Sequence, residues 1–428
     1  MRRVTGFILA ALALGLPAPG AVFGSGYAIY EQGAKAMASA GAFTARADDP
    51  SALFFNPAGI LQLDGIRFNL GTNAIFLTGS EFTSTSAPTT GQRFDQIDTM
   101  AWPSSIYYTQ KLNDSWAWGL GFTSPFGLKT EWGNTFPGRF ISREANLAVV
   151  NFNPNLAFKL GKSWSVAVGA DVARADIREL SKNIDLTLLG CPGCEGFTKL
   201  TGNANDVGWN VAARWANEKG WSWGASFRSK MKPEIDGHIK FENIPGPFVP
   251  LFPDGGAKAS LPLPATFATG AGCVKGKSEG EFDVVWTDWS EFHRLRIDVK
   301  NNTPAVADVD QIEEWKDTYS FRLGYAYHVN DMHQYRVGAY YDRNPIPDDH
   351  VRPRLPDADR TSVQIGYGYS GKGGFTLDVA YQALFFKDRT ATGSPGVPPG
   401  GGSDPVQPGE YKNFTNLLGV SLGWKFGK

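Results

Sequence analysis

The chain alternates between short polar turns and long connections, and this rhythm limits the folds it can adopt more than any other feature. The short turns contain Gly, Asn, Asp or Ser, the residues that favour tight hairpins. They lie at 112–115, 161–163, 217–220, 275–278, 330–333 and 371–374. The connections between them are much longer, at 79–101, 130–144, 181–205, 242–260, 301–315, 343–360 and 389–409. Short turns on one rim and long loops on the other are typical of a transmembrane β-barrel.

Fourteen strand-like runs lie between these turns and loops. They begin near Gly65, Trp102, Ser115, Ala145, Trp164, Asp206, Trp221, Leu261, Gly280, Asp317, Gln334, Thr361, Phe375 and Tyr411. Several runs alternate with a period of two; in the last run, Leu418, Val420 and Leu422 share one face. An even number of strands closes an antiparallel barrel without free edges. We therefore predict an all-β, 14-stranded antiparallel transmembrane β-barrel over residues 65–428. A secreted soluble all-β enzyme is the alternative that this alternation leaves open.

The start of the chain predicts export. Residues 1–24 contain Arg2 and Arg3, an apolar run from Phe7 to Leu16, and then small residues, which is the pattern of a secretory signal peptide. Aromatic residues make up 13% of the chain, and membrane barrels carry aromatic residues at both interfaces. The formal net charge is only −1, so we expect no nucleic-acid partner. We expect a monomer in the bacterial outer membrane, in contact with lipid and lipopolysaccharide and inserted by the barrel-assembly machinery.

About forty residues separate the signal peptide from the first strand. This segment, 25–64, is rich in Ala and Gly and contains a turn formed by Asn56, Pro57, Ala58 and Gly59. Its apolar content argues against a free solvated tail. We therefore predict an N-terminal plug inside the lumen. A plugged barrel does not suit free diffusion of small hydrophilic solutes, so a general polar porin is the less favoured alternative.

Several motifs resemble the FadL family of outer-membrane channels for long-chain fatty acids and aromatic hydrocarbons. They lie, in family order, at Gly26–Gly33, Ala47–Ala52, Asn56–Gly59, Asn151–Leu160, Leu261–Thr266, Trp286–Ser290 and Leu355–Arg360. The resemblance implies a fourteen-stranded barrel with an N-terminal plug, or hatch. It also implies passive uptake of a hydrophobic ligand, which extracellular loops capture, a lumen pocket binds, and a kink in the third strand releases sideways. We predict long-chain fatty acids as the transported compounds, with uncharged hydrocarbons as the alternative.

The third strand contains a sequence suited to such a kink. Ser124, Pro125, Phe126 and Gly127 interrupt an otherwise regular run. Proline removes a ladder hydrogen bond and glycine weakens a strand, so this is a favourable place for a break. An ordinary β-bulge is the alternative.

Several residues are candidates for contact with the cargo, and most of them have an alternative role. The apolar loop residues Phe248, Leu251 and Phe252 are candidates for capture, unless they only pack on each other. The resemblance places Glu179 and Gln311 where fatty-acid channels have basic residues. Nearby in sequence, Arg174, Arg178 and Lys316 are the candidates to replace them, unless these charges simply line a solvated lumen. Tyr27 of the plug is a further candidate for contact with the substrate.

No motif predicts catalysis, a metal site or a cofactor. Cys191 and Cys194 have metal-ligand or redox spacing but lie alone in a predicted extracellular loop. A structural zinc site usually has four protein ligands, so we expect a local disulfide instead. Cys273 is then left unpaired. The alternative from another class is a barrel-embedded enzyme acting on lipids, for which the sequence offers no Ser/His/Asp candidate.

Overall fold

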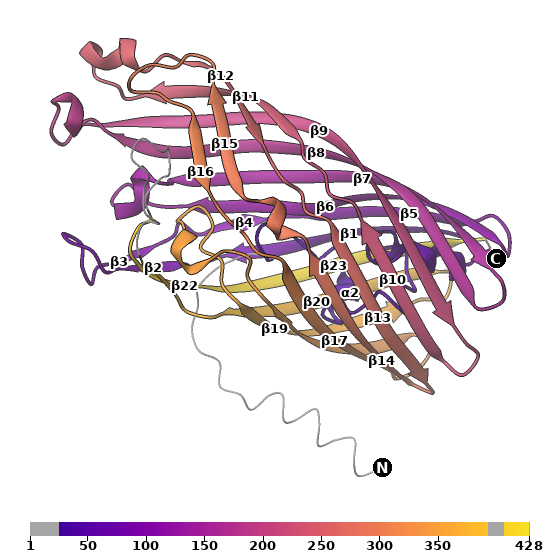
Figure 1. Ribbon diagram of the computed structural model, residues 1–428. Helices are drawn as coiled ribbons and strands as arrows, with labels where there is room; N and C mark the ends of the chain where they lie inside the picture. Colours follow the sequence, from indigo (N-terminus) through magenta and orange to yellow (C-terminus); the bar gives the residue numbers. More distant parts are fainter. Residues whose placement is uncertain (1–24, 393–405, 428) are drawn as a thin grey trace.

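The computed structural model describes residues 25–392 and 406–427. The predicted signal peptide and part of the last long loop therefore lie outside the described residues. Within them, fourteen antiparallel strands form a closed wall in which β23 pairs with β1 from Ile66 opposite Phe426 to Phe76 opposite Asn416 (Figure 1). The strands are β1 (Ile66–Leu77), β5 (Ser104–Lys111), β6 (Trp116–Glu131), β7 (Glu144–Leu160), β8 (Trp164–Asp185), β9 (Glu195–Ala216), β10 (Trp221–Arg228), β13 (Thr266–Lys275), β14 (Ser278–Thr287), β17 (Thr318–His328), β18 (His333–Asp342), β19 (Arg360–Ser370), β20 (Phe375–Phe386) and β23 (Phe414–Phe426). The wall confirms the predicted 14-stranded antiparallel barrel.

The wall is apolar on its outer face and polar on its inner face. Along β17, Tyr319 and Phe321 are exposed, whereas Ser320 and Arg322 are buried against the interior. Exposed aliphatic and aromatic side chains around the wall match a surface in contact with hydrocarbon. No helix among the described residues has the length and apolar character needed to cross a membrane.

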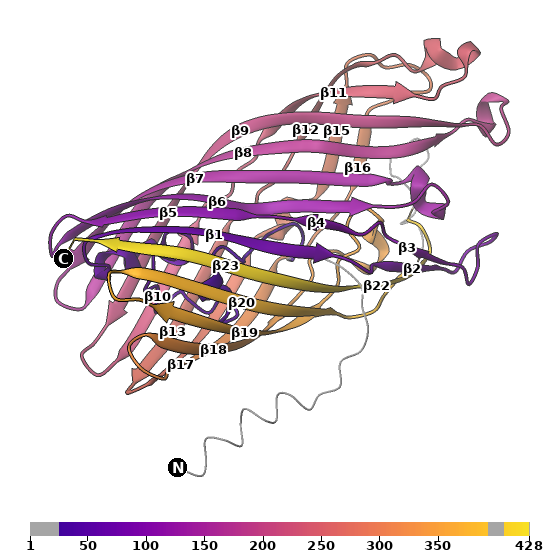
Figure 2. The same cartoon turned by 180° about the vertical axis from the view of Figure 1, so that it is seen from behind.

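The extracellular side of the wall is taller than the sequence predicts. Strands β8 and β9 have 22 residues each, so most of 181–205, expected to be a loop, is strand. The prediction of the β9 start was wrong because its outer half is polar on the outward face, as a strand beyond the bilayer should be. Four further strands extend this edge in the order β9–β11–β12–β15–β16. They are β11 (Glu234–Glu242), β12 (Gly255–Ser260), β15 (Arg294–Val299) and β16 (Val309–Ile312). Figure 2 shows β8 and β9 extending past the extracellular end of β7.

Smaller elements complete the extracellular end. A second sheet contains β2 (Glu81–Ser84), β3 (Arg93–Asp95), β21 (Arg389–Ala391) and β22 (Gly409–Lys412), and β4 (Thr99–Ala101) continues the line of β5. Short 3₁₀ turns are η2 (Pro137–Phe140), η3 (Thr187–Leu189), η4 (Gly246–Leu251), η5 (Trp289–Glu291) and η6 (Asp348–His350).

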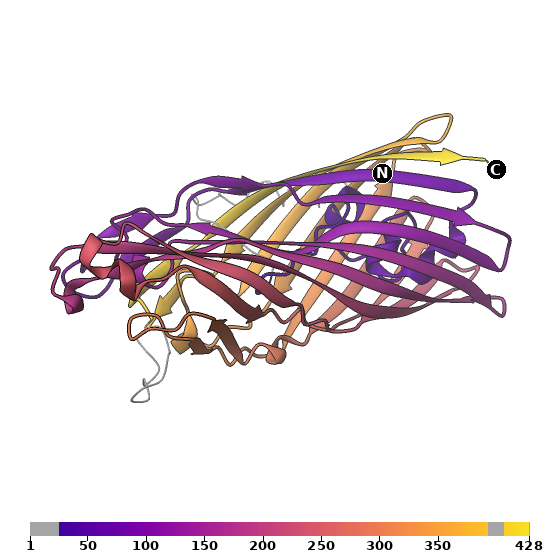
Figure 3. The same cartoon turned by 90° about the horizontal axis from the view of Figure 1, so that it is seen from above.

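Residues 25–64, which we call the plug, lie inside the lumen. The plug contains α2 (Ala34–Met37), α3 (Ala52–Phe55) and η1 (Pro57–Gln62), and Figure 3 shows it within the half of the barrel that carries the short turns. Small residues allow close contact with the wall: a Cβ added at Gly366 would lie 2.3 Å from the Cβ of Ala38. Asn56 is fully buried, and its Nδ2 donates to the carbonyls of Thr44 at 2.7 Å and Ala213 at 3.0 Å.

A row of carboxylates on β14 anchors the plug backbone. Asp283 Oδ2 accepts hydrogen bonds from the N–H groups of Phe43 and Thr44, both at 2.9 Å. Two residues closer to the short turn that precedes β14, Glu281 accepts from the N–H groups of Ala45 and Arg46 at 2.6 and 3.1 Å. Buried N–H groups need such partners, because each one left unpaired costs about 1–3 kcal/mol.

Replacement of Asp283 by Ala should loosen the plug without unfolding the wall. The variant leaves two buried N–H groups unpaired, so we expect larger and more variable ion conductance in planar bilayers, with unchanged heat-modifiable migration on gels. Asp114→Ala is the control, because the Asp114 side chain is 96% exposed on a short turn. Equal conductance of Asp283→Ala and wild type would contradict this role.

Candidate functional site

The wall is interrupted on one side of β6. Strand β5 pairs with β6 only as far as Ile106 opposite Phe122. The two chain segments meet again at the extracellular end, where Gln96 forms an isolated bridge with Trp132. Among the described residues, no strand pairs with β6 on this side between those two points. We call this interruption the window.

A bulge in β6 lies at the end of the window that is nearer the short turns. Between Thr123 and Phe126 the register with β7 shifts by one residue, so that Ser124 and Pro125 together face Val150. Proline has no N–H to donate to a neighbouring strand, which favours an unpaired edge at this point. The break expected in the third strand coincides with this bulge.

The first residues of the plug pair with the free edge of β6. The N–H of Ile29 donates to the carbonyl of Pro125 at 2.8 Å, and the N–H of Gly127 donates to the carbonyl of Tyr27 at 2.9 Å. These bonds flank an isolated antiparallel bridge between Ala28 and Phe126. The plug therefore supplies, from inside, part of the strand that the wall lacks.

Side chains hold this pairing at both ends. The amide of Gln32 donates to the carbonyl of Ser124 at 2.8 Å and accepts from its N–H at 3.1 Å. At the start of the plug, the N–H of Gly26 donates to Asp357 of the 343–360 loop at 2.9 Å. Burial raises the pKa of Asp357 to about 6, although the Arg360 guanidinium opposes this rise.

A cavity of about 360 Å³ lies at the window, and its lining includes residues from both faces of the wall. We call it the window cavity. Its lumen side includes Ile29 and Leu417, and its membrane side includes Trp102, which is 58% exposed. The lining of the window cavity also contains Glu31, Ile75, Leu77, Met100, Ser124, Phe126, Leu128, Asn146, Leu147, Ala148, Val150, Arg178 and Tyr340.

A second cavity, of about 100 Å³, lies deeper in the lumen and is mostly apolar. We call it the inner pocket; it is lined by Tyr27, Leu128, Ala145, Asn146, Leu147, Ile177, Glu179, Leu180, Leu261, Phe292, Leu295, Glu313, Trp315, Ile346, His350, Arg352, Arg354 and Leu355. Tyr27 is surrounded by aromatic rings, with centroid distances of 4.7 Å to Trp289 and 5.8 Å to Trp315. Its hydroxyl donates to the carbonyl of Pro262. Tyr27 thus joins the edge of β6 to the wall of the inner pocket.

The polar groups of the inner pocket include two arginines that the sequence reasoning missed. Arg352 Nη1 lies 2.9 Å from Glu313, and Arg354 Nη2 lies 3.5 Å from the same carboxylate. Arg354 also donates to Gln311. Gln311 stands where the resemblance leads one to expect a basic residue, so Arg354 brings a cation to that place from a different loop. The sequence signal was the Arg352-Pro353-Arg354 run within the 343–360 loop.

A third cavity, of about 320 Å³, opens between the tall extracellular strands. We call it the groove; it is lined by Phe140, Ile141, Leu180–Asp185, Thr198, Leu200, Ile239, Phe241, Phe252, Leu295, Ile297, Val299, Ala305–Ala307, Val309 and Arg354. The groove shares Leu180, Leu295 and Arg354 with the inner pocket. The inner pocket shares Leu128, Asn146 and Leu147 with the window cavity. The three cavities therefore adjoin one another in the order groove, inner pocket, window.

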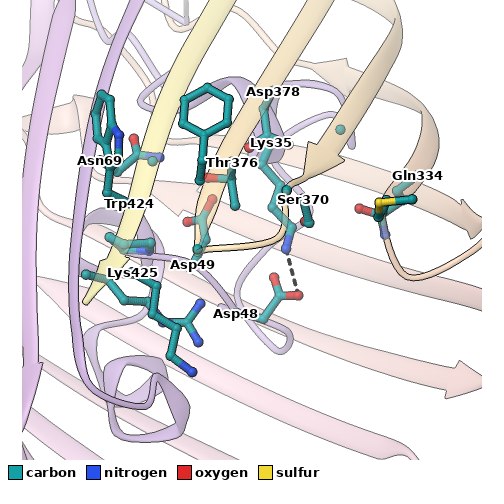
Figure 4. A pocket seen from close by; sticks show the side chains of 18 of the residues that line it. Lys35, Asp48, Asp49, Asn69, Gln334, Ser370, Thr376, Asp378, Trp424 and Lys425 are labelled. Carbon is teal, nitrogen blue, oxygen red and sulfur yellow. Dashed lines mark hydrogen bonds and ion pairs between the residues drawn. The ribbon is translucent and has the colours of Figure 1, made fainter. Parts of the chain in front are cut away.

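The cavity on the short-turn side of the plug has a different character. This periplasmic cavity, of about 300 Å³, is lined by charged and polar groups that include Lys35, Asp48, Asp49, Arg336 and Asp378 (Figure 4). Lys35 Nζ lies 2.8 Å from Asp48. Burial disfavours the charge on Asp48, but Lys35 and Arg46 outweigh that effect and hold its pKa below the ordinary value. The periplasmic cavity shares no lining residue with the other three.

The structure does not bring the predicted basic residues into the inner pocket. Arg174 lies on the outer face of β8 and approaches Asn205 at 3.5 Å. Arg178 lies on the same face, with its side chain 62% exposed, and borders the window cavity. Lys316 lines a shallow depression with residues of the 343–360 loop. Position along the chain was a poor guide here, because neighbouring residues of a strand point to opposite faces.

The other predicted residues lie at the extracellular end. Phe248 and Leu251 belong to η4 at the tip of the β11–β12 hairpin, and of the three candidates for capture only Phe252 lines the groove. Cys191 and Cys194 form a disulfide beside η3, with their Cα atoms 5.5 Å apart. Cys273 is a free thiol on β13.

Replacement of Leu147 by Trp should separate the inner pocket from the window cavity. Leu147 is 9% exposed, faces the lumen and lines both cavities, so the larger ring fills their junction. We expect an apolar fluorescent probe to bind the groove of the purified variant as it binds the wild type. Cells that express the variant should take up the probe at least ten-fold more slowly. Leu418→Trp, on the lipid-facing side of β23, is the control. Unchanged uptake in Leu147→Trp would show that the cavities do not act in series.

Comparison with known proteins agrees with the barrel fold. The model of the family described as outer membrane protein transport protein (OMPP1/FadL/TodX) matches residues 18–426. The long-chain fatty acid transport protein of Escherichia coli K12 is 26% identical over 368 residues, covering 78% of this chain and 81% of that protein. A putative outer membrane protein of Neisseria meningitidis serogroup B is 24% identical, covering 96% of each chain.

Solved structures share the fold over nearly the whole chain. A Pseudomonas aeruginosa FadL homologue superposes with a TM-score of 0.79 at 20% identity, covering 94% of this chain and all of that one (100%). The Pseudomonas putida toluene transporter TodX gives a TM-score of 0.74 at 15% identity, with coverage of 94% and 100%. The barrel and the family match place the chain in the bacterial outer membrane. The chain therefore belongs to the OMPP1/FadL/TodX family of outer membrane transport proteins.

Proposed function

We propose that this protein takes up long-chain fatty acids or similar hydrophobic compounds passively across the outer membrane. The cargo enters at the groove, binds in the inner pocket and leaves sideways through the window. The names of two relatives support this class of cargo: one is a long-chain fatty acid transport protein, and the other is a toluene transporter.

The observation that carries the proposal is the shared lining of the three cavities. Leu180 and Leu295 belong to both the groove and the inner pocket, and Leu147 belongs to both the inner pocket and the window cavity. An apolar molecule can thus pass from one cavity to the next in contact with apolar side chains. The window cavity then ends at lipid-facing residues such as Trp102.

The charges of the periplasmic half favour sideways exit over passage straight through the plug. A direct route would bring apolar cargo past Asp48 and Asp49 in the periplasmic cavity, and past the carboxylates of β14. The plug hydrogen bonds to Asp283 and Glu281 would also have to break. By contrast, the pairing of plug residues 27–32 with β6 closes the window with a small number of hydrogen bonds. Release of that pairing opens the path.

No catalysis is needed for this transport. An alkyl chain that moves from water into the bilayer gains about 0.8 kcal/mol per CH₂ group. The protein only has to carry the chain past the polar outer-leaflet surface, so we propose no enzymatic activity. We further propose that it works as a monomer, surrounded by lipid and lipopolysaccharide and inserted by the barrel-assembly machinery.

A second candidate cargo is an uncharged aromatic or aliphatic hydrocarbon. It is favoured by Glu313, which already lies within ion-pair distance of Arg352 and Arg354 in the inner pocket. A fatty carboxylate would have to compete with Glu313 for these cations, whereas a hydrocarbon would not. Preference for a long-chain acid over its alkane analogue in an uptake assay would assign fatty acids; equal uptake would assign hydrocarbons.

Deletion of Pro125 should close the window. The bulge contains one residue more than the opposite strand, so its removal restores a continuous register between β6 and β7. A regular β6 can then pair further along β5, and we expect uptake of both the acid and the alkane to fall at least ten-fold in cells that lack their own transporter. Pro125→Ala keeps the chain length and is the control, expected to retain the bulge and most of the uptake. Normal uptake by a folded deletion variant would exclude sideways exit.

A further inference from the structure

Arg178 stands out because a local irregularity of β8 places it beside the window. Asn146 of β7 lies opposite Glu179, whereas the next residue, Leu147, lies opposite Ile177. Arg178 is therefore the extra residue of a bulge. Its nearest acidic contact is weak, with Nε 4.0 Å from Asp176 Oδ2, and its side chain is 62% exposed.

The height of Arg178 in the membrane follows from the outward-facing residues of β8. They are apolar or aromatic from Trp164 to Val172 and charged from Arg174 onward. Ten residues at about 3.3 Å each separate Trp164 from Arg174, or about 33 Å along the strand. For a strand tilted by about 40°, this corresponds to about 25 Å along the membrane normal, the height of the apolar band of such barrels. Arg174 therefore lies at the edge of the apolar band, and Arg178, four residues further along β8, lies beyond it at the level of the outer-leaflet head groups.

Arg178 also borders the window cavity, whose other end lies in the lumen. The cavity contains Ile29 of the plug on its inner side and Met100 and Trp102 on the far side of the window. Ala148 of β7, which lies opposite Gly127 of β6 and Asp176 of β8, also lines this cavity and has a small side chain. The lining of one cavity therefore includes both lumen residues and a guanidinium at the membrane surface.

We propose that Arg178 receives the carboxylate of a long-chain acid as the acid leaves sideways; this inference rests on the proposed function. An acid that crosses the window can give its tail to the hydrocarbon, but burial of its charged head group there is costly. Arg178 offers a charge-assisted hydrogen bond at the level where the head group of a bilayer fatty acid rests. The tail then moves into the bilayer while the head group stays at the surface.

The other charges around the window cavity are less suited to this role. Lys129 forms an ion pair with Glu144, and its Nζ lies 3.5 Å from the Glu131 carboxylate. Glu31 accepts a hydrogen bond from Gln382 on the lumen side, where its charge repels a carboxylate and favours movement of the acid outward. Asp176 also faces outward beside Arg178. At 4.0 Å it reduces the attraction of Arg178 for an anion, but it is too far away to form a hydrogen bond with the guanidinium.

Arg174 provides a matched control. It carries the same guanidinium and projects from the same face of β8, four residues closer to the hydrocarbon, but it does not line the window cavity. An effect of interfacial charge in general, such as contact with a lipid phosphate, would involve Arg174 as well as Arg178. A role in receiving the acid would involve Arg178 alone.

The test is uptake of a long-chain fatty acid and of its alkane analogue by cells that lack their own transporter and express each full-length variant. We expect Arg178→Ala to lower uptake of the acid about ten-fold, the loss of one charge-assisted bond, while alkane uptake stays unchanged. Arg178→Lys should recover most of the acid uptake, and Arg174→Ala should affect neither compound.

Three results would overturn the inference. They are unchanged acid uptake in Arg178→Ala, an equal loss of acid and alkane uptake in that variant, and an equal loss in Arg174→Ala. In each case the wild type would still transport, so the proposed function would stand. A wild-type chain that takes up neither compound would instead overturn the proposed function together with this inference.

Discussion

Backbone hydrogen bonding at the edge of β6 is the constraint on which the rest of the structure depends. In a bilayer, unpaired N–H and C=O groups cost several kcal/mol each, so a barrel wall normally has no free edge. Here the wall leaves an edge free at the bulge, and plug residues 27–32 pair with it from inside. A few hydrogen bonds thus both complete the wall and close the route to the membrane.

The two halves of the lumen have different roles: one holds the plug, and the other contains the apolar cavities. In the half with the short turns, Asp283 and Glu281 bind the plug backbone and charged pairs surround it, so the plug is held firmly and polar contacts fill the interior. In the extracellular half, the groove and the inner pocket are mostly apolar and end at the window. The bonds from residues 43–46 to β14 are separate from the bonds of residues 27–32 to β6, so the second set can break while the first stays intact.

Much of the fold was predictable from the sequence, because a membrane barrel repeats one local rule. Turn residues and two-residue alternation gave the number of strands, and Pro125 marked the bulge. The start of β9 was missed because its outer half faces water and lacks an apolar face. The cavity lining was the least predictable part. Arg354 and Leu147 line the same pocket only because strands and loops far apart in sequence close around the lumen, and the direction of the Arg178 side chain depends on a one-residue bulge.

The most direct test of the central claim is to lock the plug to β6. Ala28 and Phe126 are bridge partners, so Ala28→Cys with Phe126→Cys, in a Cys273→Ser background, places two thiols within disulfide reach. Uptake of a long-chain fatty acid would be measured before and after reduction, with the Cys273→Ser single variant as the control for the native Cys191–Cys194 disulfide. We predict that the oxidised double variant transports at background level and that reduction restores uptake. Full uptake by the oxidised form would show that cargo leaves without release of the plug from β6, and would contradict the central claim.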